Sequence, residues 1–172
     1  MTLNGTAVSY VSSALGPWTC IQGSSSSIAP PGEVSRLAWS AGVGSIDEGP
    51  NEFGLEFFYG SVETTTGGQL TDAQFFANFE EGVWPWGDPT AELGKVEIRL
   101  YEGAINYTSS CGSGSQSNAQ VEVVDVLPIT TQFFPGSLKA RITFSCTLYA
   151  CGTGLAPKTI TNGTAVVVFG NN

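Results

Sequence analysis

The chain contains no histidine, and its 172 residues include only six lysines and arginines against fifteen aspartates and glutamates. Without histidine, a Ser-His-Asp triad, an imidazole general base and a histidine-ligated metal site are all excluded. The net charge of −9 argues against nucleic acid as a partner, because phosphate binding depends on lysine and arginine. No apolar run reaches the roughly 18 residues that a transmembrane helix requires, so we expect no membrane span.

The remaining composition favours a single exported domain over residues 1–172. The length and the hydrophobic fraction of 41% are enough to bury one core. The 22 glycines, the abundant serines and threonines and the four cysteines are typical of exported proteins. Residues 1–5 lack the basic and apolar parts of a signal peptide. We therefore expect an extracellular or cell-surface protein whose leader is absent from this sequence. The alternative is a protein that never had a leader, such as a virion component.

The four cysteines fit two disulfide bonds, and neither a C-x2-C spacing nor a histidine supports a zinc site. Three connectivities are open for Cys20, Cys111, Cys146 and Cys151. Cys146 shares the parity of the apolar residues around it, which points it inward, and Cys111 continues the parity of residues 105–109. This favours Cys111–Cys146, leaves Cys20–Cys151, and predicts no free thiol.

Alternation of apolar and polar residues with a period of two dominates the chain and predicts β-strands. Strands are predicted over residues 5–11, 34–42, 52–60, 95–102, 105–109, 119–127, 137–148 and 158–169. Strands with one apolar and one polar face suit antiparallel sheets. The predicted fold class is therefore all-β, an antiparallel β-sandwich of jelly-roll or immunoglobulin-like type. Serines at 24–27 and prolines at 30–31 predict a long exposed loop.

One segment departs from the strand pattern and predicts a short α-helix over residues 72–81. Thr71 to Gln74 matches a capping box, and Gly82 closes the segment. Phe75 and Phe79 are spaced i, i+4, and we expect them to pack onto a sheet.

The pentapeptide Asn-Gly-Thr-Ala-Val occurs at 4–8 and again at 162–166. The Asn-Gly pair predicts a tight turn or bulge at the entry to each terminal strand. If the first and last strands are neighbours in a sheet, the two termini should lie close together.

Several of these segments together resemble a known family. They are Asn4-Gly5-Thr6, Val121 to Asp125, the strand at 137–148 and Thr159 to Thr164. The pattern is similar to uncharacterised secreted β-sandwich domains of Bacteroidetes-type surface lipoproteins. The resemblance covers the two ends of the chain and roughly its last third. Ala165 stands where that family usually has an aromatic residue, and the four cysteines are not part of its pattern. The resemblance implies a fold and an extracellular setting but no catalytic residues.

The segment Val83 to Asp88 is the strongest candidate for a ligand site. Trp84 and Trp86 flank Pro85, and Asp88 and Glu92 follow closely. Indole faces stack on sugar C–H surfaces, and carboxylates accept hydrogen bonds from sugar hydroxyls. We therefore expect these four residues to form a ligand-facing surface for a glycan or surface polymer, the alternative being that both indoles fill the end of the core.

Acidic residues are concentrated in the middle of the chain. Residues 47–102 carry twelve carboxylates and two cations, a net charge of −10, whereas the rest of the chain has a net charge of +1. The loop with Asp47, Glu48 and Glu52 is a candidate for Ca²⁺, although it lacks EF-hand spacing. No other cofactor is expected. A second acidic cluster, no stronger as a candidate, comprises Glu80, Glu81, Asp88 and Glu92.

Catalysis without histidine would require a pair of carboxylates, as in glycoside hydrolysis. The acids on predicted strands are Glu56, Glu63, Glu97 and Glu102. Glu56 and Glu97 alternate with apolar residues, so we expect each to face solvent. No glycosidase motif surrounds them, so we expect no enzyme and name no catalytic residues.

The sequence therefore supports three hypotheses about function. The first is a non-catalytic extracellular module that binds a glycan or another surface ligand. The alternative is a structural subunit of a surface assembly or virion, which would form homo-oligomers. The third is a small glycoside hydrolase with a carboxylate pair. Exposure of the Trp84 and Trp86 indoles separates the first hypothesis from the second.

Overall fold

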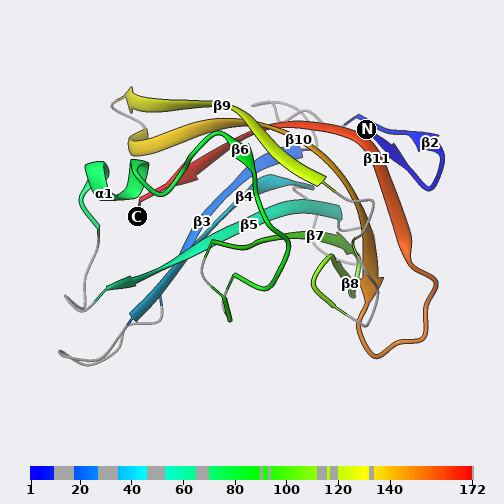
Figure 1. Ribbon diagram of the computed structural model, residues 1–172. Helices are drawn as coiled ribbons and strands as arrows, with labels where there is room; N and C mark the ends of the chain where they lie inside the picture. The colour runs from blue at the N-terminus through cyan, green and yellow to red at the C-terminus, as the bar shows by residue number, and fades with distance from the viewer. Residues whose placement is uncertain are drawn as a thin grey trace.

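The structure is a computed structural model that describes residues 1–9, 18–26, 35–45, 53–64, 70–89, 91–92, 94–111, 116, 120–131 and 134–171 (Figure 1). Its elements are β1 (Thr2–Leu3), β2 (Thr6–Ala7), β3 (Trp18–Ser26), β4 (Ser35–Ser45), β5 (Phe53–Thr64), α1 (Asp72–Phe76), β6 (Gly82–Val83), β7 (Val96–Glu102), β8 (Ile105–Thr108), β9 (Gln120–Thr131), β10 (Phe134–Ala150) and β11 (Lys158–Gly170). All pairings between these strands are antiparallel. The predicted all-β antiparallel sandwich with one short helix is confirmed.

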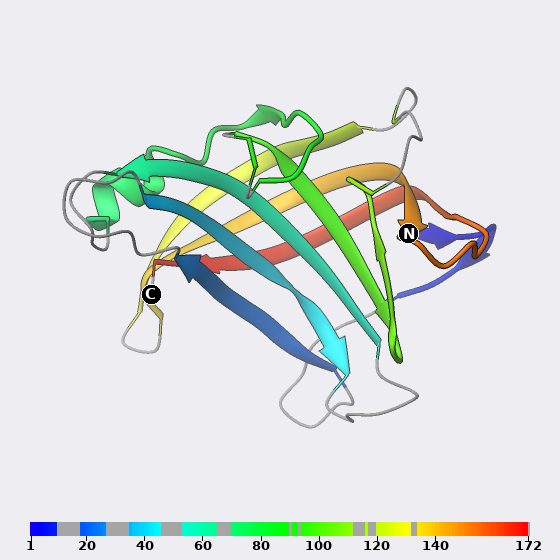
Figure 2. The same ribbon diagram turned by 90° about the horizontal axis from the view of Figure 1, so that it is seen from below.

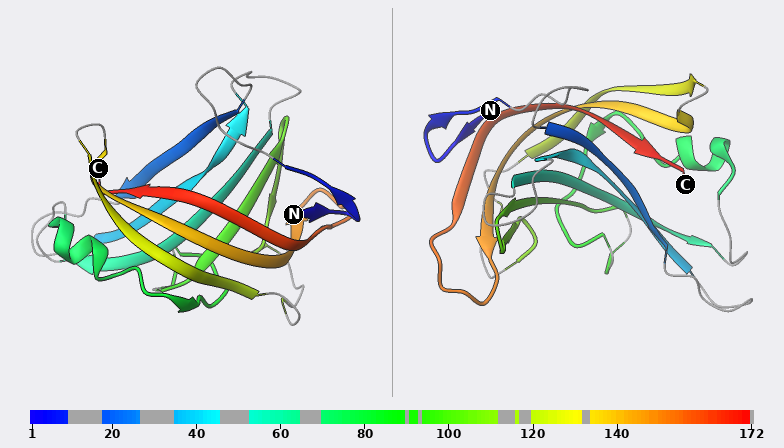
Figure 3. Two further views of the ribbon diagram at one scale, coloured as in Figure 1. Left: turned by 90° about the horizontal axis from the view of Figure 1, so that it is seen from above. Right: turned by 180° about the vertical axis from the view of Figure 1, so that it is seen from behind.

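The strands form two layers that face each other. The β3–β8 layer contains β3, β4, β5, β7 and β8, which are neighbours in that order and run as a meander (Figure 2). The β9–β11 layer contains β9, β10 and β11, with β6 on the outer edge of β9 and the β1–β2 hairpin beside β11 (Figure 3). Figure 1 shows the second layer arching over the first.

Alternating side chains of both layers meet in one core. Leu55, Phe57 and Tyr59 of β5 are buried, and so is every second residue from Leu138 to Leu148 in β10, as the sequence parity predicts. Phe57 meets Phe144 edge to face across the layers, with ring centroids 4.9 Å apart. Burial of these apolar faces is the main favourable contribution to folding.

The helix α1 begins where the sequence predicts and ends earlier. Thr71 accepts a hydrogen bond from the Gln74 amide, and the Gln74 side chain accepts one from the Thr71 amide, which completes the capping box. After Phe76 the amides of Asn78 and Phe79 bond three residues back, so the α-helical pattern stops at Phe76, not near residue 81. Phe75 and Phe79 pack against Trp39 at ring distances of 5.2 and 5.5 Å, as expected for side chains that face a sheet.

The N-terminal part of the chain differs from the sequence prediction in two places. No strand is predicted over residues 18–26, which form β3, and its last three residues, 24–26, are predicted as loop but pair with residues 37–39 of β4. Serines and glycines show no apolar alternation, so only the ladder to β4 reveals this strand. The remainder of the predicted loop, residues 27 and 30–31, lies outside the described residues. Of the predicted strand 5–11, residues 6–7 form β2, which pairs with β1 in a short hairpin, and residues 10–11 lie outside the described residues. Asn4 and Gly5, with φ of 48° and 82°, make the tight turn between β1 and β2.

The second Asn-Gly pair lies inside β11 and makes a bulge. Asn162 has φ of 51°, and the pairing register with β10 shifts between Phe144 and Cys146. A Cβ atom on Gly163 would lie 2.6 Å from the Phe144 ring, so only glycine fits there. Thr2 pairs with Thr161, which confirms that the first and last strands are neighbours. The two ends of the chain nevertheless lie far apart, because β11 continues well beyond β1 (Figures 1 and 3).

Candidate functional site on the outer face of the β9–β11 layer

Trp84 does not face solvent. Its residue is 4% exposed, its ring stacks on Tyr59, and its indole Nε1 donates to the Glu80 carbonyl at 2.9 Å. The prediction of an exposed indole at this position is wrong. The reason is β6: Val83 pairs with Glu122, and the Trp84 amide donates to Val121, so this short strand alternates Val83 outward and Trp84 inward.

Because Trp84 is buried, it does not share a surface with the other three residues of the predicted ligand site. Trp86 is half-buried, and its backbone bridges Val96 at the start of β7. Asp88 is half-buried, and Glu92 is exposed with a carboxylate 3.3 Å from the Lys95 ammonium. The four residues therefore do not make one aromatic face with two indoles.

The predicted Ca²⁺ loop with Asp47, Glu48 and Glu52 lies outside the described residues. Within the described part of the chain, no group of three or more acidic or cysteine side chains is placed to hold a metal ion. Glu80 and Glu81 are exposed, and the Glu81 carboxylate accepts a hydrogen bond from the amide of Val126.

Glu97 is buried, contrary to the solvent-facing position that its alternation predicts. Its side chain lies on the outer side of β7, yet the residue is only 3% exposed. Burial raises the pKa of this carboxyl, and the charges of Asp88 and Glu56 act in the same direction, while the ion pair with Arg99 opposes them. Period-two alternation identifies the face of a strand but not what lies over that face.

Glu56 is the cross-strand neighbour of Arg99 and accepts a hydrogen bond from the Tyr101 hydroxyl at 3.1 Å. Glu56, Glu97, Arg99 and Tyr101 thus form a network in which carboxylates are matched by a guanidinium and a phenol. Such a network stabilises its own charges. The hydrogen bonds and ion pairs within it are those of a structural cluster.

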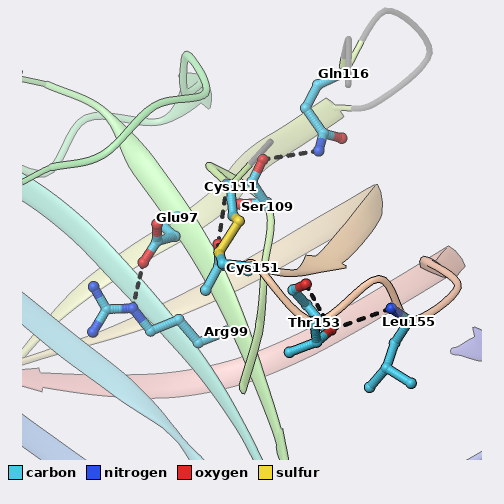
Figure 4. Close-up of a disulfide and its surroundings, with 10 residues drawn as sticks. Glu97, Arg99, Ser109, Cys111, Gln116, Cys151, Thr153 and Leu155 are labelled. Atoms are coloured by element: carbon cyan, nitrogen blue, oxygen red, sulfur yellow. Dashed lines mark hydrogen bonds and ion pairs between the residues drawn. A yellow bond between two sulfur atoms is a disulfide. The ribbon is translucent and has the colours of Figure 1, made fainter. Parts of the chain in front are cut away.

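The cysteines pair differently from the predicted scheme. Cys111 bonds to Cys151, with Cα atoms 5.8 Å apart (Figure 4). Cys146 is a free, buried thiol, so the prediction of no free thiol is wrong. Cys146 does point inward as its parity predicts. Cys111 lies past the end of β8, where strand parity no longer applies. For Cys20 the structure describes the backbone within β3 but not the side chain.

The disulfide adjoins the seam where the two layers share hydrogen bonds. Among the described strands, β8 and β10 provide this junction with two residue pairs, Tyr149 with Thr108 and Ala150 with Tyr107. The amide of Gln116 extends it. It donates to the Ser109 carbonyl at 2.9 Å and to the Thr147 carbonyl at 2.6 Å. It also accepts from the Thr147 amide at 3.2 Å, so it substitutes for one residue of a paired strand. Figure 4 shows its contact with Ser109.

The β11 strand adds an ion pair to this seam. Lys158 lies 2.5 Å from the Glu102 carboxylate of β7 and 4.9 Å from the centroid of the Tyr107 ring of β8. Sequence alternation predicts neither this contact nor the role of Gln116, because both depend on how the two layers meet.

The outer face of the β9–β11 layer carries an unusual set of side chains. Lys139 and Arg141 point outward between the buried residues Leu138, Ala140 and Ile142 of β10. Their neighbours across the ladder are partly apolar. We define this face by Val83, Glu122, Asp125, Leu127, Lys139, Arg141, Val166 and Val168.

Three exposed apolar residues of the described part of the chain lie on this face. In the described residues, four large hydrophobic side chains are exposed, and Val83, Leu127 and Val166 of this face are 63%, 52% and 62% exposed. The fourth, Leu155, lies in the connection between β10 and β11. Across the strand ladders Val83 lies beside Glu122, Leu127 beside Lys139 and Val166 beside Arg141, so exposed apolar and charged side chains alternate over this face.

No protein-family model, curated protein or solved structure matches this chain. In the described residues, none of the helical structure has the length and apolar character to pass through a bilayer.

Proposed function

We propose that this protein is a non-catalytic structural subunit of a surface assembly, and that it contacts a second copy of itself through the outer face of the β9–β11 layer. The observation that carries the proposal is that three of the four exposed large hydrophobic residues among the described ones, Val83, Leu127 and Val166, lie on that face. Glycan binding through two exposed indoles loses its main support because Trp84 is in the core. The alternative of an assembly subunit is the better supported of the two hypotheses.

Charge supports a second copy as the partner. The chain has a net charge of −9, and residues 47–102 alone account for −10. Lys139 and Arg141 stand at the centre of the proposed contact face, where Arg141 is paired with Asp125 at 2.7 Å. The two cations of this face are matched by the carboxylates of Glu122 and Asp125, so the face has no net charge and does not repel the same face of another copy as the acidic remainder of the chain would.

The proposed setting is extracellular or at the cell surface. The Cys111–Cys151 bond is of the kind that persists in oxidising compartments. The resemblance to secreted domains of surface lipoproteins supports the same setting.

Sedimentation velocity over a range of protein concentrations tests the proposed contact. We expect the unmodified protein to self-associate and the double variant Leu127→Glu/Val166→Glu to remain monomeric. The matched control is Leu155→Glu, which alters an equally apolar exposed residue away from the face and should associate like the unmodified protein. A protein that is monomeric at every concentration, or a control that loses association as the double variant does, would overturn the proposal.

A further inference from the structure

One edge of β9 is only partly covered. Along its length this strand pairs with β10, from Gln120 opposite Ser145 to Thr131 opposite Phe134. On its other side, in the part of the chain that the structure describes, it pairs with β6 at Val123 and Glu122, and the Trp84 amide donates to the Val121 carbonyl. The remainder of that edge runs from Val124 to the end of the strand.

The sequence of β9 makes this edge a strong template for pairing. The strand is rich in β-branched and aliphatic residues, namely Val121, Val123, Val124, Val126, Leu127 and Ile129. Such segments have high β-propensity, and an open edge of this kind readily adds a strand from another molecule.

Two features block the hydrogen-bond donors along this edge. The Val126 amide points away from β10 and donates to the Glu81 carboxylate at 3.3 Å. Amides that point to the same side recur every second residue, so the next position is Pro128, which has no amide hydrogen. One donor is therefore occupied by a carboxylate and the next is missing.

We infer that Glu81 and Pro128 hold the β9 edge closed against β9 of a second copy. Two identical edges related by a two-fold axis are self-complementary, so another β9 is the natural partner. In the unmodified protein the Glu81 carboxylate of each copy lies where the backbone of the partner's β9 would approach. This inference does not depend on the contact through the outer face of the β9–β11 layer. It adds that assembly, where it occurs, does not use this edge.

The test compares variants in a Val166→Glu background, so that contact through the outer face does not mask edge pairing. Glu81→Ala removes the acceptor and the charge, Glu81→Gln removes only the charge, and Pro128→Val restores the missing donor. Glu80→Ala is the matched control, because Glu80 is equally exposed and its side chain has no part in the edge. Near-ultraviolet circular dichroism of the aromatic cluster confirms that each variant is folded.

Sedimentation equilibrium gives the dissociation constant of self-association, and infrared spectra report new intermolecular strand pairing. We expect Glu81→Ala/Pro128→Val to dimerise with a dissociation constant at least about tenfold lower than that of the background. We expect self-association to be weakest in the background and in Glu80→Ala. It should become stronger in the order Glu81→Gln, Glu81→Ala and Glu81→Ala/Pro128→Val. Faster exchange of the Val126 amide is expected in Glu81→Ala at concentrations where it is monomeric. A double variant that associates no more than Glu80→Ala overturns the inference, whatever the behaviour of the outer-face variants.

Discussion

Tyr59 of β5 and Trp84, the residue after β6, stack their rings with centroids 3.5 Å apart and an angle of 18° between the planes. The Tyr59 hydroxyl donates to the Asn78 carbonyl, and the Trp84 indole donates to the Glu80 carbonyl. The stack thus joins the two layers and anchors the connection between α1 and β6.

We therefore predict different effects for the two tryptophans of the loop. Trp84→Ala should lower the free energy of unfolding by about 3–5 kcal/mol, the usual cost of truncating a buried aromatic side chain. Trp86→Ala should cost clearly less because Trp86 is half-buried. Urea denaturation monitored by circular dichroism measures both. Equal losses would mean that Trp86 contributes to the core as much as Trp84.

The seam between the layers leads to a second prediction. Replacing Cys111 and Cys151 together by serine should lower the free energy of unfolding by about 2–4 kcal/mol, because the bond closes a loop with a sequence separation of 40 residues. Reduction of the unmodified protein should have the same effect and should leave the double variant unchanged. If the reductant destabilises both proteins equally, its effect does not come from the Cys111–Cys151 bond.

Gln116 permits a more local test of the same seam. Gln116→Ala leaves the Thr147 amide and carbonyl without this partner, so we expect a loss of about 1–3 kcal/mol in the free energy of unfolding. Hydrogen exchange at Thr147 should become faster. Gln120→Ala, at an exposed glutamine of β9, is the control and should leave that exchange rate unchanged.

The free thiol of Cys146 should be detectable but protected. Its side chain is buried, which raises the pKa of the thiol to about 12, so almost no reactive thiolate exists at neutral pH. We expect alkylation without reductant to be very slow in the native protein and fast in denaturant. Cys146→Ala should abolish the fast labelling at this position in peptide mass spectra. Rapid labelling of Cys146 in the native protein would contradict its burial.

Glu97 should make stability depend on pH. Burial raises the pKa of its carboxyl in the folded state above the value in the unfolded chain. The folded protein therefore binds this proton more tightly, and the corresponding stability is present below the unfolded pKa and lost as pH rises through the folded pKa.

Glu97→Gln mimics the protonated form and should remove this dependence. The free energy of unfolding of the unmodified protein should fall relative to that of the variant as pH increases from acidic to neutral values. Chemical denaturation of both proteins across that range measures the difference. If the variant instead loses stability relative to the unmodified protein as pH rises, the ion pair with Arg99 outweighs burial.

Strand alternation predicted much of the fold because it is a local property of each strand. The buried alternation of Leu138, Ala140 and Ile142 and the capping box at Thr71 follow directly from neighbouring residues. The missed features depend on partners that are distant in sequence. The serine-rich end of β3 is a strand because β4 provides its ladder, and Trp84 faces inward because the two residues of β6 pair with β9. The exposed patch was not predictable either, since Val83, Leu127 and Val166 come from three strands that only the sheet brings together.

The pairing of β1 with β11 also has a consequence for folding kinetics, because it joins segments far apart in the sequence. Leu3 pairs with Ile160, and the hydrogen-bonded residues Asn4 and Thr159 lie 155 positions apart in the sequence. Contacts between residues so far apart in sequence are slow to form. Pulse-labelling of a refolding sample would detect protection of the β1 amides last. We therefore expect docking of the β1–β2 hairpin onto β11 to be one of the last steps of folding.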